Sequence, residues 1–499
     1  MSTLNTRDLL DLMAKIAPGL GAAEQESLEE ATFFRNFLPL PDHARALDPD
    51  ILLILGGRGA GKTELFRVLA YPNGLGALAA EQKQALPFDP ARTIWVPGFG
   101  RTHKDPRAFP PPEVLSDHLS GADSQHLRAF WLGLLVGRLL NVLGQDAVGG
   151  DWAQALSPDL QRSLAETSML AKWLGQSRAR LDEVNDALDR IDVRLARGNQ
   201  WLFITYDELD RLLPNYNQLS APIRELLALW LDRWRRWERI RPKIFLRNDL
   251  FREEFLAFPD ASKLRGHRVE ITWQAPSLYR LLAKRIANAG EMAQTYFDRY
   301  VQRMPLQRTD ILGLLPENSE AGFTSLMETM VGRYMGANIQ KGRTYYWIPN
   351  HLQDAAGQIA PRSFLKLFAL AAESARDKAD TLSLPTVLRP TDLQGALMET
   401  STDRIRELQE EYPWMEALKE ALTGLEVPAL RHEFQRRLTR ANWGREASRA
   451  LPDQSASGVF NHLKDIGVVA LRRDGKVNVP EIYLYGFGLK RRGGISRPR

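Results

Sequence analysis

Residues 51–70 read Ile-Leu-Leu-Ile-Leu-Gly-Gly-Arg-Gly-Ala-Gly-Lys-Thr-Glu-Leu-Phe-Arg-Val-Leu-Ala. An unbroken apolar run from Ile51 to Leu55 opens this stretch, and it predicts a fully buried strand. Glycine tolerates positive φ angles without a steric cost, so residues 56–61 suit a tight turn. Residues 64–70 then continue as a helix. The order of strand, turn and helix predicts one unit of an α/β fold.

The glycine-rich segment is predicted to bind nucleotide phosphates. Gly56 to Thr63 matches G-x-x-x-x-G-K-[ST], the P-loop pattern, in which backbone N–H groups and a helix N-terminus bind anions. Lys62 is expected to reach the β- and γ-phosphates and the Thr63 hydroxyl to bind Mg²⁺. A glycine-rich turn without a ligand is the alternative, but the flanking strand and helix favour the phosphate site. The predicted nucleotide-binding residues are Gly56, Gly57, Arg58, Gly59, Ala60, Gly61, Lys62, Thr63 and Glu64. The predicted cofactors are ATP and Mg²⁺.

Further apolar segments predict the remaining strands of this sheet. They are Thr93–Pro97, Trp201–Tyr206, Lys243–Arg247 and Val269–Trp273. Long segments with helical periodicity separate them. Parallel neighbours need long crossover connections, so this alternation predicts a parallel sheet with helices on its faces.

Two adjacent carboxylates follow the strand Trp201–Tyr206. Asp207 is predicted to hold Mg²⁺, either directly or through a bound water, as a Walker B aspartate does, and Glu208 is predicted to polarise an attacking water as a general base. An Asp-Glu pair after a strand is common, but together with the phosphate loop it supports a hydrolytic site. Asp210 and Arg211, in the same turn, are interpreted as a surface ion pair.

The combined motifs resemble the AAA+ and STAND-type ATPases, particularly the origin-recognition-like branch. Within this resemblance, Asn248 matches the sensor-1 residue that detects the γ-phosphate. Arg265 matches an arginine finger offered to a neighbouring subunit, with Arg268 as the second choice. Arg362 matches the sensor-2 arginine that closes over the bound phosphates. For each residue, capping a helix or an ordinary surface position is the alternative.

The resemblance covers residues 51–372 and implies a domain plan. Residues 1–50 form an N-terminal helical segment, 51–275 the P-loop ATPase core, 276–380 a helical lid with an insert, and 381–499 a helical linker with a basic winged-helix-like domain. Segments 98–200 and 291–350 exceed a minimal core and have no assigned role. The chain also looks like bacterial P-loop ATPases of defence-type gene neighbourhoods, which suggests an antiviral role by analogy.

The C-terminal region is markedly basic. Residues 425–499 hold fifteen Lys and Arg against seven Asp and Glu, whereas the whole chain has a net charge of +5. Residues 458–467 predict a helix, 468–471 a strand, and 472–476 a hairpin turn followed by a second β segment through Ile482. This pattern is similar to a winged helix, and its Arg and Lys side chains predict contact with nucleic acid, either DNA or RNA. A winged helix that binds protein is the alternative.

Composition excludes several other classes of protein. The 499-residue chain has no cysteine, so disulfides, thiolate metal sites and cysteine nucleophiles are excluded. Its eight histidines show no metal-binding spacing. The longest apolar run is too short for a membrane span, and the polar first ten residues predict no signal peptide, so a soluble cytoplasmic protein is expected.

Two functions remain as the leading hypotheses. The first is a Mg²⁺-dependent ATP hydrolase that couples turnover to conformational change or assembly on DNA. The second is a STAND-like switch that holds its nucleotide, turns over little and recruits an effector protein. An arginine finger acting in trans implies a homo-oligomer. A small-molecule kinase is a weaker third hypothesis, because it gives the sensor-like segments no purpose.

Overall fold

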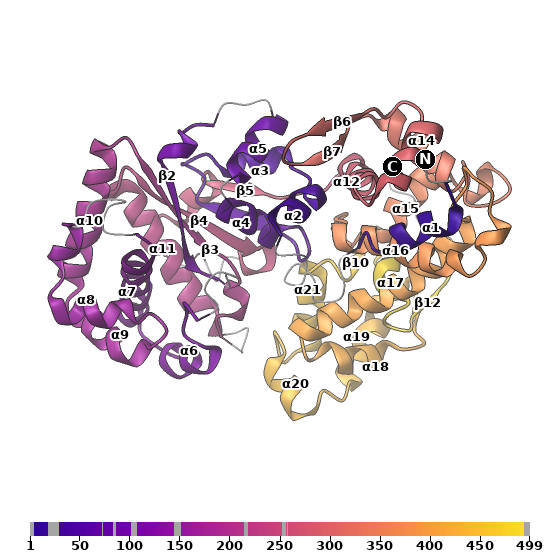
Figure 1. The fold of residues 1–499 in the computed structure, drawn as a ribbon. Helices are drawn as coiled ribbons and strands as arrows, with labels where there is room; N and C mark the ends of the chain where they lie inside the picture. The colour runs from indigo at the N-terminus through magenta and orange to yellow at the C-terminus, as the bar shows by residue number, and fades with distance from the viewer. Residues whose placement is uncertain are drawn as a thin grey trace. The chain divides into compact units, whose positions relative to one another are not determined.

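The computed structural model describes residues 4–17, 29–71, 73–82, 86–100, 107–143, 151–213, 218–251, 256 and 258–493. The chain divides into two compact units (Figure 1). One unit comprises Pro39–Ile271, and the other comprises Met1–Leu38 together with Thr272–Arg499. Among the described helices, none combines the length and the hydropathy needed to cross a membrane.

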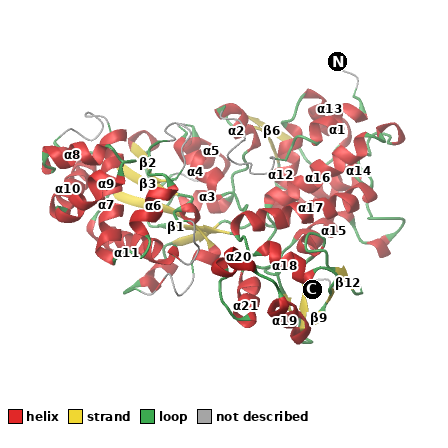
Figure 2. Cartoon of the chain, turned by 90° about the horizontal axis from the view of Figure 1, so that it is seen from below, coloured by secondary structure: helices red, strands yellow, loops and turns green. Residues whose placement is uncertain are grey.

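A five-stranded parallel sheet forms the centre of the Pro39–Ile271 unit (Figure 2). Its strands, in spatial order, are β2 (Thr93–Phe99), β3 (Trp201–Tyr206), β4 (Ile240–Arg247), β1 (Leu53–Gly56) and β5 (Arg268–Glu270). All four strand pairs are parallel, which confirms the predicted α/β sheet. Every residue of β1 and β4 is buried, as the unbroken apolar run predicts for β1, whereas β4 also buries the charged residues Arg241, Lys243 and Arg247. Parallel strands end at the same edge, so the segments that follow β1, β3 and β4 come together there.

Helices lie on both sides of this sheet and in a large insert between β2 and β3. The helices that flank β1 along the chain are α3 (Pro41–Ala46), α4 (Lys62–Ala70) and α5 (Gly74–Gln82). The insert contains α6 (Pro112–Leu119), α7 (Ser124–Val142), α8 (Pro158–Ala165), α9 (Leu170–Ala179) and α10 (Leu181–Arg197). Helix α11 (Ser220–Arg236) precedes β4. The 98–200 segment, which has no role predicted from the sequence, therefore contains α6 to α10; residues 101–106 and 144–150 of it lie outside the described residues.

The insert is held by a buried aromatic and aliphatic core. The α10 side chains of Val184, Leu188, Ile191 and Leu195 are fully buried, as their helical spacing predicts. Trp131 of α7 packs edge-on against Tyr206 of β3 and donates its indole N–H to the Pro222 carbonyl at 2.9 Å. The insert is thus continuous with the core beneath the sheet.

The second unit begins with two N-terminal helices and a helical array. These are α1 (Thr6–Met13), α2 (Glu30–Asn36), α12 (Ala275–Ala287), α13 (Glu291–Tyr300), α14 (Glu320–Met330), α15 (Thr344–Leu352), α16 (Pro361–Arg376) and α17 (Pro390–Glu411). A hairpin of β6 (Leu306–Thr309) and β7 (Gly313–Pro316) interrupts the predicted helical pattern. Gly313, at φ +68°, opens β7 after the turn, and Asn288 donates to the Leu314 carbonyl at 2.7 Å, which fixes the hairpin against α12.

Small sheets and short helices complete the C-terminal region. Its helices are α18 (Met415–Leu422), α19 (Arg431–Arg440), α20 (Gly444–Ala450), α21 (Ala456–Asp465) and α22 (Glu481–Leu484). Strands β10 (Ala470–Leu471), β11 (Lys476–Asn478) and β9 (Ala429–Leu430) form an antiparallel sheet, and β8 (Glu426–Val427) pairs with β12 (Lys490–Arg491). The predicted hairpin turn is present, since the Arg472 N–H donates to the Lys476 carbonyl at 2.8 Å. The predicted β segment through Ile482 is wrong at its end, because Pro480 caps α22 and turns the chain into a helix.

Candidate nucleotide-phosphate site

The turn after β1 depends on its glycines. Gly59 and Gly61 have φ angles of +76° and +91°, which side-chain-bearing residues rarely adopt. A Cβ on Gly56 would lie 3.1 Å from the Ala60 Cβ, a tight contact that would displace Ala60. Helix α4 begins directly at Lys62, and no side chain caps its N-terminus. The first-turn N–H groups and the helix dipole therefore face the glycine turn, an arrangement that suits an anion.

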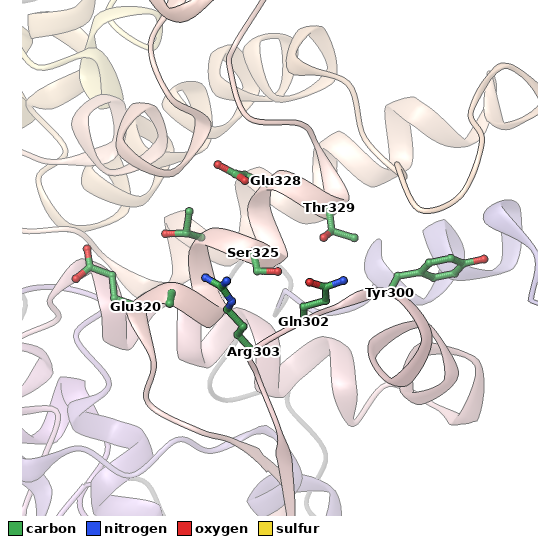
Figure 3. Close-up of a pocket in the computed structure, with 9 residues that line it drawn as sticks. Tyr300, Gln302, Arg303, Glu320, Ser325, Glu328 and Thr329 are labelled. Atoms are coloured by element: carbon green, nitrogen blue, oxygen red, sulfur yellow. The ribbon is translucent and has the colours of Figure 1, made fainter.

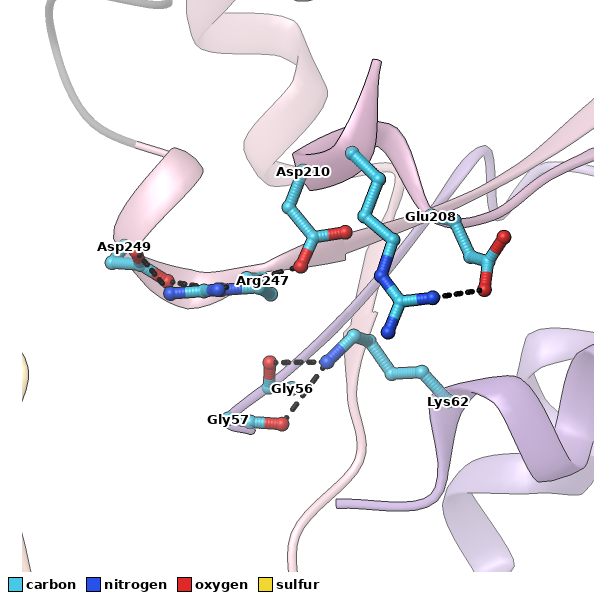
Figure 4. A network of polar contacts seen from close by, with 8 residues as sticks. Gly56, Gly57, Lys62, Glu208, Asp210, Arg247 and Asp249 are labelled. Carbon is cyan, nitrogen blue, oxygen red and sulfur yellow. Dashed lines mark hydrogen bonds and ion pairs between the residues drawn. The ribbon is translucent and has the colours of Figure 1, made fainter. Parts of the chain in front are cut away.

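Lys62 folds back over the glycine turn (Figure 4). Its Nζ donates to the carbonyl oxygens of Gly56 and Gly57, each at 3.0 Å. Burial, and after it the nearby Arg247 guanidinium, lower the pKa of Lys62 from 10.5 to about 8, while Asp207 and other carboxylates oppose the change. The ammonium group has no close carboxylate partner in the described residues. A polyphosphate is the kind of ligand that would satisfy it.

Asp207 lies at the end of β3, against the same helix N-terminus. Only 4% of the residue is exposed, and its backbone N–H donates to the Phe99 carbonyl at 3.0 Å. Burial raises the pKa of this carboxyl, whereas the Glu208 N–H, the Thr63 hydroxyl and the charge of Lys62 act in the opposite direction. Among the described residues, none hydrogen-bonds its Oδ2 atom.

The pairing of Thr63 with Asp207 fits a magnesium ion. Mg²⁺ takes oxygen ligands, keeps several waters and typically uses one or two protein groups beside the substrate phosphates. The Thr63 hydroxyl and the Asp207 carboxylate, whose buried Oδ2 has no hydrogen-bond partner in the described residues, match that requirement. The described residues contain no cluster of three His, Asp or Glu that would make a self-sufficient metal site. This donor set therefore depends on a phosphate-bearing ligand to complete it.

Glu208 has an unusual backbone for a non-glycine residue. Its φ is +55°, in the left-handed region, and such conformations cluster at functional sites. Its carboxylate forms an ion pair with Arg211 at 3.2 Å, and its side chain is 14% exposed. Asp210 pairs instead with Arg247 at 3.4 Å. The predicted ion pair between Asp210 and Arg211 is therefore wrong, because the short helical turn after Glu208 sends their side chains to different partners.

Arg247 is the member of this site that sequence reasoning missed. It ends β4 directly beside Gly56 in the parallel register. Its guanidinium binds Asp249 through two nitrogens, at 3.0 and 2.7 Å, and reaches Asp210 (Figure 4). The residue is 8% exposed, and its charge acts on Lys62. The available signal was an arginine at the carboxyl end of an apolar strand.

The predicted sensor-1 residue lies at the same sheet edge but faces outward. Asn248 is exposed, and its side-chain amide donates to Glu270 at 2.7 Å. The structure thus brings Lys62, Thr63, Asp207, Glu208 and Arg247 together, with Asn248 one residue beyond this group.

The two candidate finger arginines lie near β5. Arg265 ends a short 3₁₀ helix (Ala261–Arg265) and is exposed, and no carboxylate of the described residues forms an ion pair with it. Arg268 is exposed as well, with its guanidinium 5.4 Å from the Phe251 ring centre.

Arg362 belongs to the second unit. It lies in the first turn of α16 and pairs with Glu407 of α17 at 3.3 Å. Glu407 also accepts from Arg404 at 2.9 Å, and the Glu407 side chain is only 6% exposed. A buried carboxylate therefore holds this arginine.

A separate pocket in the second unit is less suited to a nucleotide. It has a volume of about 760 Å³ and is lined by polar side chains from α14 and the end of α13 (Figure 3). The pocket is lined by two acidic residues, Glu320 and Glu328, and one basic residue, Arg303, so its net negative charge disfavours a polyphosphate.

Comparison with protein-family models and with curated proteins finds no match. Among solved structures, the chain is similar to the Aeropyrum pernix ORC2 protein in ADPNP–ADP complexes, with 15% identity, a TM-score of 0.38, and 91% of this chain and 94% of that chain covered. The Aeropyrum pernix ORC1 protein in complex with DNA matches with 15% identity and a TM-score of 0.31, and the match covers 89% of this chain and 90% of that chain. CDC6P from Pyrobaculum aerophilum matches with 14% identity and a TM-score of 0.29, and the match covers 92% of this chain and 97% of that chain. With TM-scores this low, the assignment of the site rests on its own geometry.

Proposed function

We propose that this protein is a Mg²⁺-dependent ATP hydrolase that couples ATP binding and hydrolysis to a conformational change or assembly on DNA. One observation carries the proposal. Lys62, at the N-terminus of α4, lies within electrostatic reach of Asp207, whose buried Oδ2 has no hydrogen-bond partner in the described residues. The positively charged phosphate site around Lys62 and the Asp207 carboxylate, which is suited to a metal ion, thus lie at the same edge of the sheet, as phosphoryl transfer requires.

Each residue has a distinct role in this proposal. The backbone of residues 56–61 holds the phosphates, and the Lys62 ammonium exchanges the carbonyls of Gly56 and Gly57 for phosphate oxygens. Thr63 and Asp207 would hold Mg²⁺, which would supply positive charge against the transferring phosphoryl group. Glu208, once released from Arg211, accepts a hydrogen bond from the attacking water and draws its proton away.

The other predicted residues also take part in the reaction in this proposal. Asn248 reports the state of the γ-phosphate after leaving Glu270. Arg265 is exposed and is free to serve a second copy of the chain as an arginine finger, with Arg268 as the alternative. Arg362 exchanges Glu407 for the bound phosphates, which would connect nucleotide state to the helical unit.

The basic C-terminal region fits a polyanion, and in this proposal the polyanion is DNA. Helix α19 and the β10–β11 turn expose a set of cations, namely Arg431, Arg436, Arg437, Arg440, Arg472, Arg473 and Lys476. Such side chains neutralise phosphates and give affinity more than sequence choice. The helix pair α19 and α21 with the antiparallel β10–β11–β9 sheet supports a winged-helix-like interpretation of this region. Arg497 and Arg499 of the predicted basic tail lie outside the described residues.

A nucleotide-held switch is the second candidate, and one observation favours it. Glu208 is engaged by Arg211 and Lys62 by its own loop, so the resting site is not arranged for turnover. In this alternative the protein retains its nucleotide and recruits an effector protein. Steady-state turnover near zero, with nucleotide co-purifying, would favour the switch.

Two substitutions test the proposed hydrolase. Lys62→Ala should abolish nucleotide binding, because it removes the ammonium group from the cradle. Glu208→Gln should bind ATP normally and lose turnover, by about 100-fold or more if the carboxylate is the general base. The measurements are equilibrium binding of a fluorescent ATP analogue and phosphate release. Normal phosphate release by Glu208→Gln would remove the base assignment.

A further inference from the structure

Residues 332–343, between α14 and α15, form a closed loop with a fixed base. The Met335 N–H donates to the Gly342 carbonyl at 3.0 Å, and the Thr344 N–H donates to the Arg333 carbonyl at 3.1 Å. Tyr334 and Arg343 pair as an antiparallel bridge between these bonds. Met335 and Thr344 are buried, so the base of this 332–343 loop is anchored in the helical unit.

The tip of the 332–343 loop holds an apolar side chain in water. Ile339 is 61% exposed, the largest value among the exposed large apolar side chains of the described residues. The tip is an ordered turn, because the Asn338 side chain accepts from the Gln340 N–H at 3.1 Å and the Gly342 N–H donates to the Ile339 carbonyl at 3.0 Å. A preorganised loop loses less conformational entropy when it binds a partner.

The charge of the 332–343 loop is uniformly positive. Arg333, Lys341 and Arg343 are all exposed, and residues 331–353 contain no Asp or Glu. Arg333 pairs with Glu328 at 3.6 Å, but both side chains are more than 40% exposed, so this pair contributes little. Within the described part of the chain, no carboxylate pairs with Lys341 or Arg343. Three closely spaced cations therefore lack a strong counterion.

We propose that the 332–343 loop is a binding element for duplex DNA, separate from the basic C-terminal region. Exposed cations without a strong acidic partner fit the phosphates on either side of a groove. An exposed apolar residue at the tip of a rigid loop fits the minor groove, where such side chains insert against base steps. A protein partner would have to supply both an acidic surface and an apolar recess. The proposal rests on the proposed function only in taking DNA as the ligand.

The test is a salt titration of the full-length protein with a labelled duplex, followed by fluorescence anisotropy. The loop variant carries Arg333→Ala, Lys341→Ala and Arg343→Ala. The matched control carries Arg7→Ala, Arg376→Ala and Lys378→Ala, three exposed cations of the same unit that lie beside acidic residues. The loop variant should bind about tenfold more weakly, with a salt slope smaller by about 0.9 for each DNA phosphate that the protein no longer neutralises. The control should keep the wild-type slope.

The outcomes distinguish a failure of the loop assignment from a failure of the proposed function on DNA. If the wild type binds DNA and the loop variant keeps the same affinity and salt slope, the loop assignment alone is overturned. The same holds if DNA binding by the control weakens as much as binding by the loop variant. No binding by the wild type at low salt would contradict both proposals. Hydrogen exchange of the wild-type protein gives a readout without substitution: DNA should slow exchange of the amides at 336–341, and unchanged exchange there would also overturn the assignment.

Discussion

Removing Arg247 should destabilise the Pro39–Ile271 unit far more than removing an exposed arginine. The Arg247 and Asp249 side chains are 10% and 11% exposed, and two guanidinium nitrogens bind this carboxylate. Truncation of one partner leaves a desolvated carboxylate without its counterion, which typically costs about 3–5 kcal/mol. Arg247→Met keeps most of the side-chain volume, so the loss of charge dominates the effect.

The size of this effect follows from burial, and the chain provides a matched control. Arg235 pairs with Asp260 at 3.1 Å, but the two side chains are 51% and 47% exposed. Arg235→Met should therefore cost less than about 1 kcal/mol. For a unit of this size, about 3 kcal/mol corresponds to a fall in Tm of about 6–12 °C.

The assay is thermal unfolding followed by circular dichroism, with urea unfolding to obtain the free energy. Arg247→Met should show the large fall in Tm and Arg235→Met nearly none. The Lys62 pKa should also rise in Arg247→Met, since the guanidinium lowers it in the wild type. Equal Tm values for the two variants would refute the assignment of Arg247 to a buried charge network.

Two further predictions concern the same unit. Because the pKa of Lys62 is lowered to about 8 and phosphates would raise it again, ATP binding at pH 8.5 should take up a proton. Calorimetry in buffers of different ionisation enthalpy should detect this uptake, and buffer-independent heats would contradict it. Gly98→Ala should cost about 1–3 kcal/mol of unfolding free energy, because its Cβ would lie 2.6 Å from a β3 side-chain atom. Gly175→Ala, with open space around its Cβ in α9, should instead be neutral or stabilising, and equal urea midpoints for the two variants would show that Gly98 is not sterically required.

The sheet and the phosphate loop were predictable because they depend on local patterns. Unbroken apolar runs such as Trp201–Tyr206 indicate buried strands, and their separation by helices indicates parallel pairing. The glycine turn was predictable because its positive φ angles require glycine at Gly59 and Gly61.

Side-chain partners at the sheet edge were not predictable from sequence. Arg247 and Asn248 are adjacent, and only the register that pairs Gly56 with Arg247 shows which of them is buried beside the loop. Likewise, the left-handed backbone at Glu208 determines that Arg211 pairs with Glu208 and Asp210 with Arg247. The β6–β7 hairpin was missed because its strands are short and lie within a segment of helical pattern.

The most direct test of the central claim is the dependence of ATP affinity on magnesium in Asp207→Asn, with Asp210→Asn as the control from the same turn. If Asp207 and the glycine loop hold one metal–nucleotide complex, Mg²⁺ should tighten ATP binding in the wild type and in Asp210→Asn. The same ion should have almost no effect on the affinity of Asp207→Asn. An Asp207→Asn protein whose ATP affinity gains as much from Mg²⁺ as the wild type would contradict the account.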